Sequence, residues 1–331
     1  MRVYNKQSDK RLSSQLQAGV QEVRKQRNFD AKKYIAQKAE LLNSYMKKCK
    51  LSACVIGVSG GVDSAIVLGL VNHASKQKGS PIKKVVPLLM PILKSSGTTN
   101  QGRATSRGVE LCEKLGLEPI ILDLSKENFE IKEAVEHGLN LKGNDWALGQ
   151  LVSYSRTPVL YYTTSVLTQE GFSAITCGTT NRDEGAYLGF IGKASDAMVD
   201  IQLISDIHKS EVYKVAQELG VPDVIISALP SGDMYDSRTD ETVFGASYDF
   251  VEFYLNYLNW EDSKKQSFYD NLNEESKQQF DLYSSNLENL HRYNAHKYLA
   301  KSPAVHLDLM DASVRGGWDN YYEVIKKFMS K

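Results

Sequence analysis

The sequence predicts an α/β fold, a doubly wound parallel sheet of about five strands followed by a largely helical C-terminal part. Short apolar runs alternate with segments of helical periodicity from residue 53 to residue 178. This alternation is typical of a parallel sheet that helices cover on both faces. The 331 residues suffice for one large domain or two small ones. Ligands of such sheets bind beyond the carboxyl ends of the strands, so a binding site is expected at that edge.

Two helices are expected before the sheet. The polar segment 1–28 carries apolar residues at helical spacing, which predicts a peripheral helical extension. These apolar residues are Leu12, Leu16, Val20 and Val23. Asp30 is a typical N-cap residue for a second amphipathic helix that follows it.

Strands and helices then alternate along the chain. The expected strands are "SACVIGV", "KKVVPLLM", "EPIILDL" and "FSAITCG". Helices are predicted over 64–76 and 99–115, from Ser125 onward, and over 145–169.

The C-terminal part is predicted to be helical and irregular. The polar stretch 227–240, "SALPSGDMYDSRTD", is long for a plain connection and indicates a mobile functional loop. A helix is predicted over 240–258, with aromatic residues on its core face. Residues 259–288 are strongly polar and are expected to form a solvated surface insertion, and the tail 291–331 is expected to end in a helix.

The composition argues against several classes of partner. Lys and Arg number 40, as do Asp and Glu, so the formal net charge is zero and nothing draws the chain generally to nucleic acid or membranes. No apolar run approaches the roughly 20 residues that span a bilayer. The four cysteines form no C-x-x-C pair, which favours reduced thiols in a cytoplasmic protein and argues against zinc. The basic, Ser-rich N-terminus leaves a transit peptide as the alternative.

The stretch SGGVDS joins the first predicted strand to its helix. Gly60 and Gly61 allow a sharp turn and a close approach of the backbone to a ligand. The N–H groups of the helix start then form an anion site suited to phosphate, to which Ser59 and Ser64 add hydroxyl donors. Asp63 would repel a phosphate unless a divalent cation lay between them. The stretch therefore predicts a nucleotide phosphate bound with Mg²⁺, whereas a plain turn would explain the glycines alone.

This loop resembles the S-G-G-x-D-S signature of the ATP pyrophosphatases, also called adenine-nucleotide α-hydrolases. Neither a Walker A motif nor G-x-G-x-x-G occurs in the chain. The resemblance implies a Rossmann-like fold and attack on the α-phosphate of ATP. It also implies an adenylated intermediate and the release of pyrophosphate.

Later motifs resemble one branch of that superfamily, the NAD synthetases. "GTTNRDE" is similar to their G-T-x-N-x-x-E segment, and "DIHKSEV" to their D-L-x-K-x-E-V segment. "DETVFGASYDFVEFYL" and "NAHK" are similar to their later motifs. The resemblance runs from about residue 30 to about residue 303. It implies an ammonia-dependent carbon–nitrogen ligase that forms a homodimer, with a single domain over 29–331 and no glutaminase domain.

The resemblance also implies roles for individual residues. Asp63 and Glu184 would be the Mg²⁺ ligands, although a helix N-terminal acid is the plainer reading of Glu184. Lys209 would stabilise charge on the α-phosphate and the leaving pyrophosphate. Ser231 would close over the adenylate and exclude water. The implied ATP contacts are Ser59, Gly60, Gly61, Asp63, Ser64, Met90, Thr179, Lys209 and Ser231.

On the acceptor side, Asp196 would hold ammonium and accept its proton, which completes a catalytic set with Lys209 and Ser231. The implied substrate contacts are Arg156, Lys193, Asp196, Asp200, His296 and Lys297. Arg156 takes the place of the second arginine in the family's G-N-x-x-A-R-x-R segment. Gln150 and Tyr154 stand where that segment has its asparagine and its first arginine.

The implied reaction converts deamido-NAD to NAD in two steps. The pyridine carboxylate attacks the α-phosphate of ATP, and ammonia then displaces AMP from the acyl-adenylate. The departures from the family pattern gather on the acceptor side, where "GKASDAM" replaces T-K-Y-G-D-G-G. Nicotinic acid mononucleotide is therefore an alternative acceptor, with a tRNA base less expected. A non-catalytic, ATP-binding regulatory protein is the alternative from another class.

Overall fold

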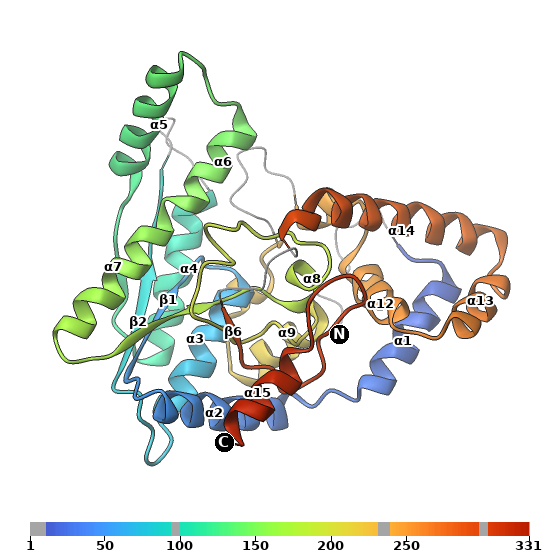
Figure 1. Cartoon of the computed structure of the whole chain (residues 1–331), viewed down its shortest axis with the longest axis horizontal. Coiled ribbons are helices and arrows are strands. Elements are labelled where there is room, and N and C mark those ends of the chain that lie inside the picture. The colour runs from blue at the N-terminus through green and yellow to red at the C-terminus, as the bar shows by residue number, and fades with distance from the viewer. Residues whose placement is uncertain (1–10, 94–99, 231–238, 298–303, 331) are drawn as a thin grey trace.

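The computed structural model describes residues 11–93, 100–230, 239–297 and 304–330, and within them the chain forms one six-stranded parallel sheet (Figure 1). The strand order is β3-β2-β1-β4-β5-β6. The strands are β1 (Ala53–Gly57), β2 (Lys84–Leu89), β3 (Ile120–Ile121), β4 (Ala174–Gly178), β5 (Ile201–Gln202) and β6 (Val305–His306). The predicted α/β sheet is confirmed, with six strands where about five were expected. The four strands identified from the sequence correspond to β1–β4, and the two-residue strands β5 and β6 were not among them.

The helices expected from the sequence are present, with bounds close to those predicted. The earlier ones are α1 (Ser14–Arg27), α2 (Ala31–Lys48), α3 (Val62–Ser75), α4 (Asn100–Leu115), α5 (Ser125–Leu139), α6 (Asp145–Tyr154) and α7 (Arg156–Gln169). The later ones are α8 (Arg182–Gly185), α9 (Lys209–Glu218), α10 (Asp223–Ile226), α11 (Asp240–Phe244), α12 (Tyr248–Leu258), α13 (Asp262–Asp270), α14 (Glu274–Asn294), the 3₁₀ turn η1 (Ala295–Lys297) and α15 (Tyr321–Met329). None of these helices is both long and apolar enough to cross a bilayer.

Two predicted helices are interrupted. The stretch 145–169 divides into α6 and α7 at Ser155, and 240–258 divides into α11 and α12 at Gly245. Gly245 has a φ of 66°, a left-handed conformation that glycine adopts readily and that ends a helix. As expected, Asp30 caps α2, because its Oδ1 accepts a hydrogen bond from the backbone of Lys33 at 3.0 Å.

Helices cover both faces of the sheet. Cys54 and Ile56 of β1 point into a core shared with α2, α3 and α9. Val55, between them in the sequence, points into the core on the other face, with Val152 of α6 and Leu160 of α7. Successive side chains of a strand alternate between the faces, so a continuous apolar run is what a doubly covered strand requires.

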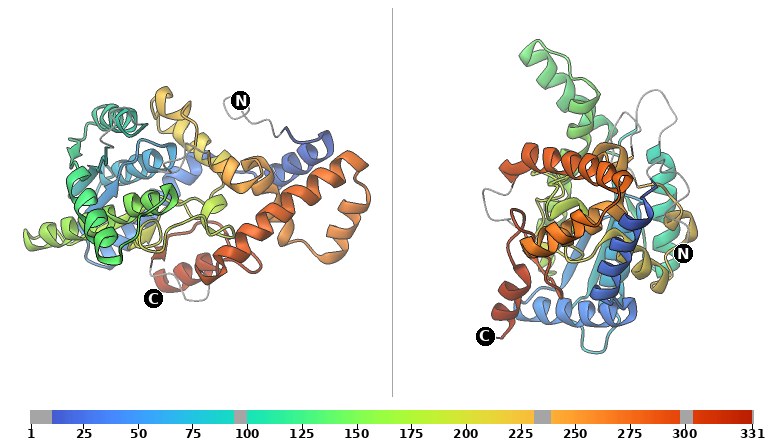
Figure 2. Two further views of the ribbon diagram at one scale, coloured as in Figure 1. Left: turned by 90° about the horizontal axis from the view of Figure 1, so that it is seen from above. Right: turned by 90° about the vertical axis from the view of Figure 1, so that its right-hand side faces the viewer.

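A second apolar core lies away from the sheet, where α1, α12, α13 and α14 gather at one end of the molecule (Figures 1 and 2). Leu16 of α1, Phe250 of α12 and Leu287 of α14 are fully buried there, and Phe280 of α14 is 6% exposed. The prediction of a solvated segment over 259–288 holds for α13, which buries no residue. It is wrong for α14, because single apolar residues at helical spacing suffice to dock a mostly polar helix.

The added strand β6 brings a buried histidine against the sheet. His306 is 3% exposed, stacks on Tyr321 at 4.0 Å between ring centroids, and its Nδ1 lies 2.9 Å from the hydroxyl of Ser205. Burial lowers the pKa of His306 to about 3, so the side chain is neutral in the folded protein. The unfolded chain takes up a proton at this residue as the pH falls below about 6.5, and the folded chain does not.

We therefore expect His306 to make the fold acid-sensitive. Its contribution is complete above about pH 6.5 and is lost as the pH falls toward 3. Between about pH 7.5 and about pH 5, the wild type should lose about 2 kcal/mol more unfolding free energy than His306→Gln. Urea titrations at the two pH values measure this difference. The control His73→Gln removes an exposed histidine and should keep the wild-type dependence; equal losses in all three proteins would contradict the prediction.

Candidate active site

The SGGVDS loop connects the carboxyl end of β1 to α3, as predicted. Gly60 has a φ of 77°, and a Cβ there would lie 2.1 Å from the carbonyl oxygen of Ala104. A side chain is therefore excluded at this position by both conformation and space. The hydroxyls of Ser59 and Ser64 lie 3.1 Å apart, and the Ser64 hydroxyl donates to the carbonyl of Gly61. The loop thus arrives preformed at the N-terminus of α3, the end of a helix that favours an anion.

Three predicted residues from distant parts of the sequence meet beside this loop. Lys209, the first residue of α9, is 2% exposed. Its Nζ lies 2.5 Å from Oδ2 of Asp63 on α3 and 3.0 Å from Oε1 of Glu184 on α8. An ammonium group buried this deeply requires such partners, because an unpaired charge would be very costly there. The structure therefore brings the two proposed metal ligands and the proposed catalytic lysine into direct contact.

Neighbouring side chains hold the two carboxylates in place. Asn181 donates from Nδ2 to Oδ1 of Asp63 at 2.8 Å, and its own Oδ1 accepts the backbone N–H of Glu184. The hydroxyl of Tyr248 lies 2.8 Å from Glu184 and 2.9 Å from Asp240. Asn181 and Tyr248 were not assigned a role from the sequence, although both stand within the quoted motifs.

The local charges shift the ionisation of this cluster. Burial raises the pKa of Glu184 to about 7, Lys209 opposes that rise, and Asp63 adds to it. Burial alone would lower the pKa of Lys209, but Asp63 and Glu184 raise it well above its usual value. Lys209 therefore carries its full positive charge at the phosphate loop, which is the charge that a transferred phosphoryl group needs nearby.

The donor set fits a hard divalent cation. Asp63 and Glu184 bring two carboxylates to the phosphate loop, one on each side of the Lys209 ammonium. Mg²⁺ in nucleotide sites takes one or two carboxylates and completes its shell with phosphate and water. Among the described residues, no three His, Cys, Asp or Glu side chains are grouped so as to hold a metal by themselves. Two acids at a phosphate loop are thus consistent with a cation that arrives with a nucleotide.

A cavity opens next to the loop, between the carboxyl ends of the strands and helices α6 and α7. Among the predicted residues, it is lined by Ser59, Met90, Arg156, Thr179 and Asp196. The guanidinium of Arg156 donates from Nε to the carbonyl of Met90 at 3.1 Å, which joins α7 to the end of β2. The predicted ATP side and part of the predicted acceptor side therefore share one cavity.

Other predicted acceptor-side residues have different surroundings. Asp200 accepts hydrogen bonds from the backbone and the hydroxyl of Thr176 at 2.7 and 2.9 Å, which ties β5 to β4. Lys297 donates to backbone carbonyls of the segment after α8, while Lys193 and His296 are exposed. None of these four side chains lines the cavity. Ser231 lies outside the described residues.

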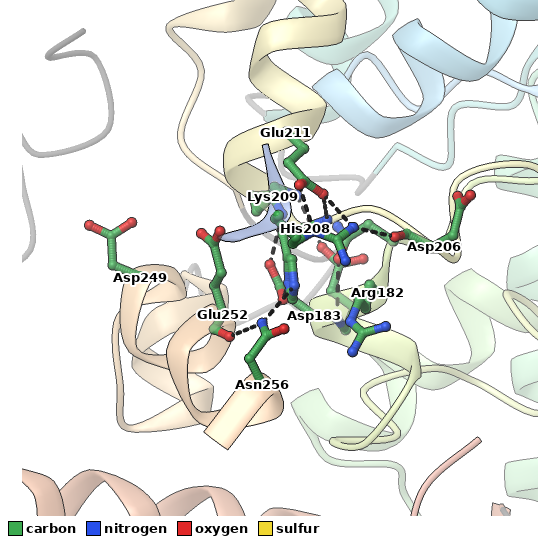
Figure 3. Close-up of polar contacts among 12 residues, drawn as sticks. Arg182, Asp183, Asp206, His208, Lys209, Glu211, Asp249, Glu252 and Asn256 are labelled. Carbon is green, nitrogen blue, oxygen red and sulfur yellow. Dashed lines mark hydrogen bonds and ion pairs between the residues drawn. The ribbon is translucent and has the colours of Figure 1, made fainter. Parts of the chain in front are cut away.

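Asp183 and His208 form a buried pair next to Lys209 (Figure 3). The sequence motifs did not predict this contact. Oδ1 of Asp183 lies 2.5 Å from Nδ1 of His208, and both side chains are inaccessible to solvent. Burial raises the pKa of Asp183 to about 7 and lowers the pKa of His208 to about 3. His208 is therefore neutral.

Comparison with known proteins identifies the family of the chain. The NAD synthase family model matches residues 34–299. An NH(3)-dependent NAD(+) synthetase of Alkaliphilus oremlandii is 29% identical, over 67% of this chain and 84% of its own length. That of Syntrophomonas wolfei is 31% identical, over 63% of this chain and 78% of its own length. An NMN synthetase structure from Francisella tularensis has a TM-score of 0.64 and 22% identity, covers 83% of this chain and 99% of its own, and supports the fold. The chain belongs to the NAD synthase family.

Proposed function

We propose that this protein is an ammonia-dependent ligase that amidates deamido-NAD to NAD at the expense of ATP. The observation that carries the proposal is the contact of Lys209 with Asp63 and Glu184 beside a preformed phosphate loop. Family membership and the names of the relatives support the same reaction.

In the first step, an oxygen of the pyridine carboxylate attacks the α-phosphorus of ATP, and the bond to the leaving pyrophosphate breaks. The N–H groups at the start of α3 bind the phosphates. Lys209 stabilises the negative charge that develops on the α-phosphate and pyrophosphate, without transferring a proton. Asp63 and Glu184 would hold Mg²⁺, which supplies further charge neutralisation at the phosphates.

In the second step, the nitrogen of ammonia attacks the acyl carbon, the bond to AMP breaks, and one proton leaves the nitrogen. Asp196 lines the cavity and is the proposed proton acceptor. Its Oδ2 accepts from the backbone of Gly192 at 2.9 Å and from the hydroxyl of Ser195 at 3.1 Å, which orients the carboxylate. Ser231 is proposed to close over the adenylate, so that ammonia and not water reaches it.

One observation favours the mononucleotide as the second candidate acceptor. Tyr154 and Gln150 occupy two positions of the family's substrate-binding segment, and the Tyr154 hydroxyl donates to Oε1 of Gln150 at 2.8 Å. This pair offers no cation to a second phosphate group. Nicotinic acid mononucleotide has the same reacting carboxylate and a smaller remainder, so the same chemistry applies to it.

The proposed assembly is a homodimer, and the proposed catalytic domain covers residues 29–331. Helices α5, α6 and α7 lie at the end of the molecule opposite α14 (Figure 1). On these helices and on the segment between α5 and α6 lie large apolar side chains that are more than half exposed. They include Phe129, Leu139, Leu141, Trp146 and Tyr162. Apolar surface of this kind is typical of an interaction site, and Arg156 at the start of α7 would bring the interface next to the acceptor. We place the protein in the cytoplasm.

The acceptor is the first thing to test. With ATP, Mg²⁺ and ammonium, we expect pyrophosphate release that depends on deamido-NAD, measured in a coupled assay. A kcat/KM higher for deamido-NAD than for nicotinic acid mononucleotide would support the main proposal, and the reverse would make the protein an NMN synthetase. ATP binding without turnover on either acceptor would contradict both and favour a regulatory protein.

Removal of the Lys209 charge tests the phosphate chemistry. Lys209→Met should lower kcat roughly 100-fold or more with a smaller change in the KM for ATP, because the charge acts mainly in the transition state. The control Lys214→Met removes an exposed lysine from the same helix and should keep wild-type kcat. Steady-state kinetics measure both variants. Wild-type turnover in Lys209→Met would show that the proposed role is wrong.

The apolar surface of α5–α7 gives a prediction about assembly. Trp146→Glu places a charge on that surface, where the native side chain is 61% exposed, and should shift the protein from dimer to monomer in sedimentation velocity. Tyr293→Glu changes an aromatic residue that is 82% exposed on α14 and should leave the dimer intact. A dimer of unchanged affinity in Trp146→Glu would place the interface elsewhere.

A further inference from the structure

Helix α1 precedes the region that the family model matches, yet one of its arginines, Arg27, contacts Glu211 in the first turn of α9. The Nε and Nη2 atoms of Arg27 lie 2.6 and 2.9 Å from the two carboxylate oxygens of Glu211. Nη2 also donates to the backbone carbonyl of Asp206 at 2.8 Å. The side chain of Arg27 is 10% exposed and that of Glu211 is 3% exposed, so this is a buried, two-pronged ion pair.

Glu211 in turn fixes the first turn of α9. Its Oε2 accepts the backbone N–H of His208 at 2.9 Å. On the other side, Oδ2 of Asp183 accepts the backbone N–H of Lys209 at 2.7 Å. Two carboxylates thus bind consecutive N–H groups at the start of the helix, where the orphan donors and the helix dipole favour negative charge.

The imidazole of His208 orients Asp183. Its Nε2 lies 3.0 Å from Nδ2 of Asn256, and an amide nitrogen can only donate. Nε2 is therefore the acceptor, and Nδ1 carries the proton that points to Asp183. His208 and Asp183 are fully buried, so this bond holds the carboxylate under the N–H of Lys209 and does not face the cavity.

Lys209 depends on its backbone for its placement. A lysine side chain has four rotatable carbon–carbon bonds and makes no planar, two-pronged bond of its own. Its Nζ must nevertheless lie between Asp63 and Glu184. Displacement of a reacting group by about 1 Å can cost roughly 100-fold in rate. A shift of the first turn of α9 would move the ammonium by a comparable amount.

We propose that Arg27 is a positioning residue for Lys209 and acts through Glu211. Helix α1 would thereby contribute to the site at which the adenylyl group of ATP is transferred. The inference rests on the proposed role of Lys209. The inference predicts that replacing Arg27 slows the chemical step. An arginine that only attached a peripheral helix would affect stability without affecting that step.

A second arginine on α1 provides the matched control. Arg24 binds Glu252 at 2.6 Å and Asp249 at 2.5 Å, and both of these acids lie on α12. Arg24→Met therefore removes an ion pair of the same kind from the same helix, one turn earlier. It leaves the contacts between Arg27, Glu211 and the first turn of α9 in place.

The test compares kcat and the KM for ATP in the pyrophosphate-release assay, below the melting temperature of every variant. We expect Arg27→Met to lower kcat about tenfold or more with the KM for ATP within about twofold. Arg24→Met should lower the melting temperature similarly and keep kcat within about twofold. Arg27→Lys should recover part of the loss, because it restores the charge. Arg27→Met combined with Glu211→Gln should be no slower than Glu211→Gln alone.

Hydrogen exchange provides a readout that does not depend on turnover. Exchange at the backbone amides of 208–211 should accelerate in Arg27→Met and stay at the wild-type rate in Arg24→Met. Equal kcat and equal exchange in the two variants would overturn the inference. If Lys209→Met loses activity while Arg27→Met does not, the inference fails and the proposed function stands. If the wild type is inactive with every acceptor, the proposed function fails, and exchange alone decides whether Arg27 positions α9.

Discussion

The buried ammonium of Lys209 is the constraint on which the site depends. It is 2% exposed, so the fold must supply negative charge to it from at least one side. Asp63 lies in the first turn of α3, which follows β1, and Glu184 lies on α8, which follows β4. β1 and β4 are neighbours in the sheet, which places their carboxyl ends side by side. The strand order therefore brings together residues that are more than a hundred positions apart.

The side chains around this contact are buried and polar. Burying polar groups destabilises the fold unless each of them has a hydrogen-bond partner. Asn181 binds Asp63, Tyr248 lies against Glu184, and Asp183 binds both His208 and the backbone of Lys209. Each hydrogen bond restricts a side chain that could otherwise adopt several rotamers. Preorganisation of this kind lets charge act on a transition state without first reorienting.

The elements that could be predicted from the sequence are those whose structure is determined by neighbouring residues. The apolar run before SGGVDS and the glycines within it identified β1, the loop and α3, because each is specified by adjacent residues. β5 and β6 were missed, since each is identified only by its pairing with a neighbouring strand in the folded sheet. The break at Ser155 has a local signal that the prediction did not use, because Pro158 has no N–H group to bond to the carbonyl of Tyr154 in a continuous helix. The docking of α14 depends on tertiary contacts. His208 gave no signal, because what makes it informative is burial against Asp183 and Asn256.

The two halves of the proposed site are built differently, and this bears on how substrate choice is encoded. The phosphate side consists of a glycine loop without room for a side chain and of buried ion pairs, so few substitutions leave it intact. The acceptor side relies on exposed or locally bonded groups such as Lys193, Asp196 and Tyr154. Surface positions of this kind change at little cost in stability. The departures from the family pattern lie on that side, where a change of acceptor leaves the proposed adenylation chemistry untouched.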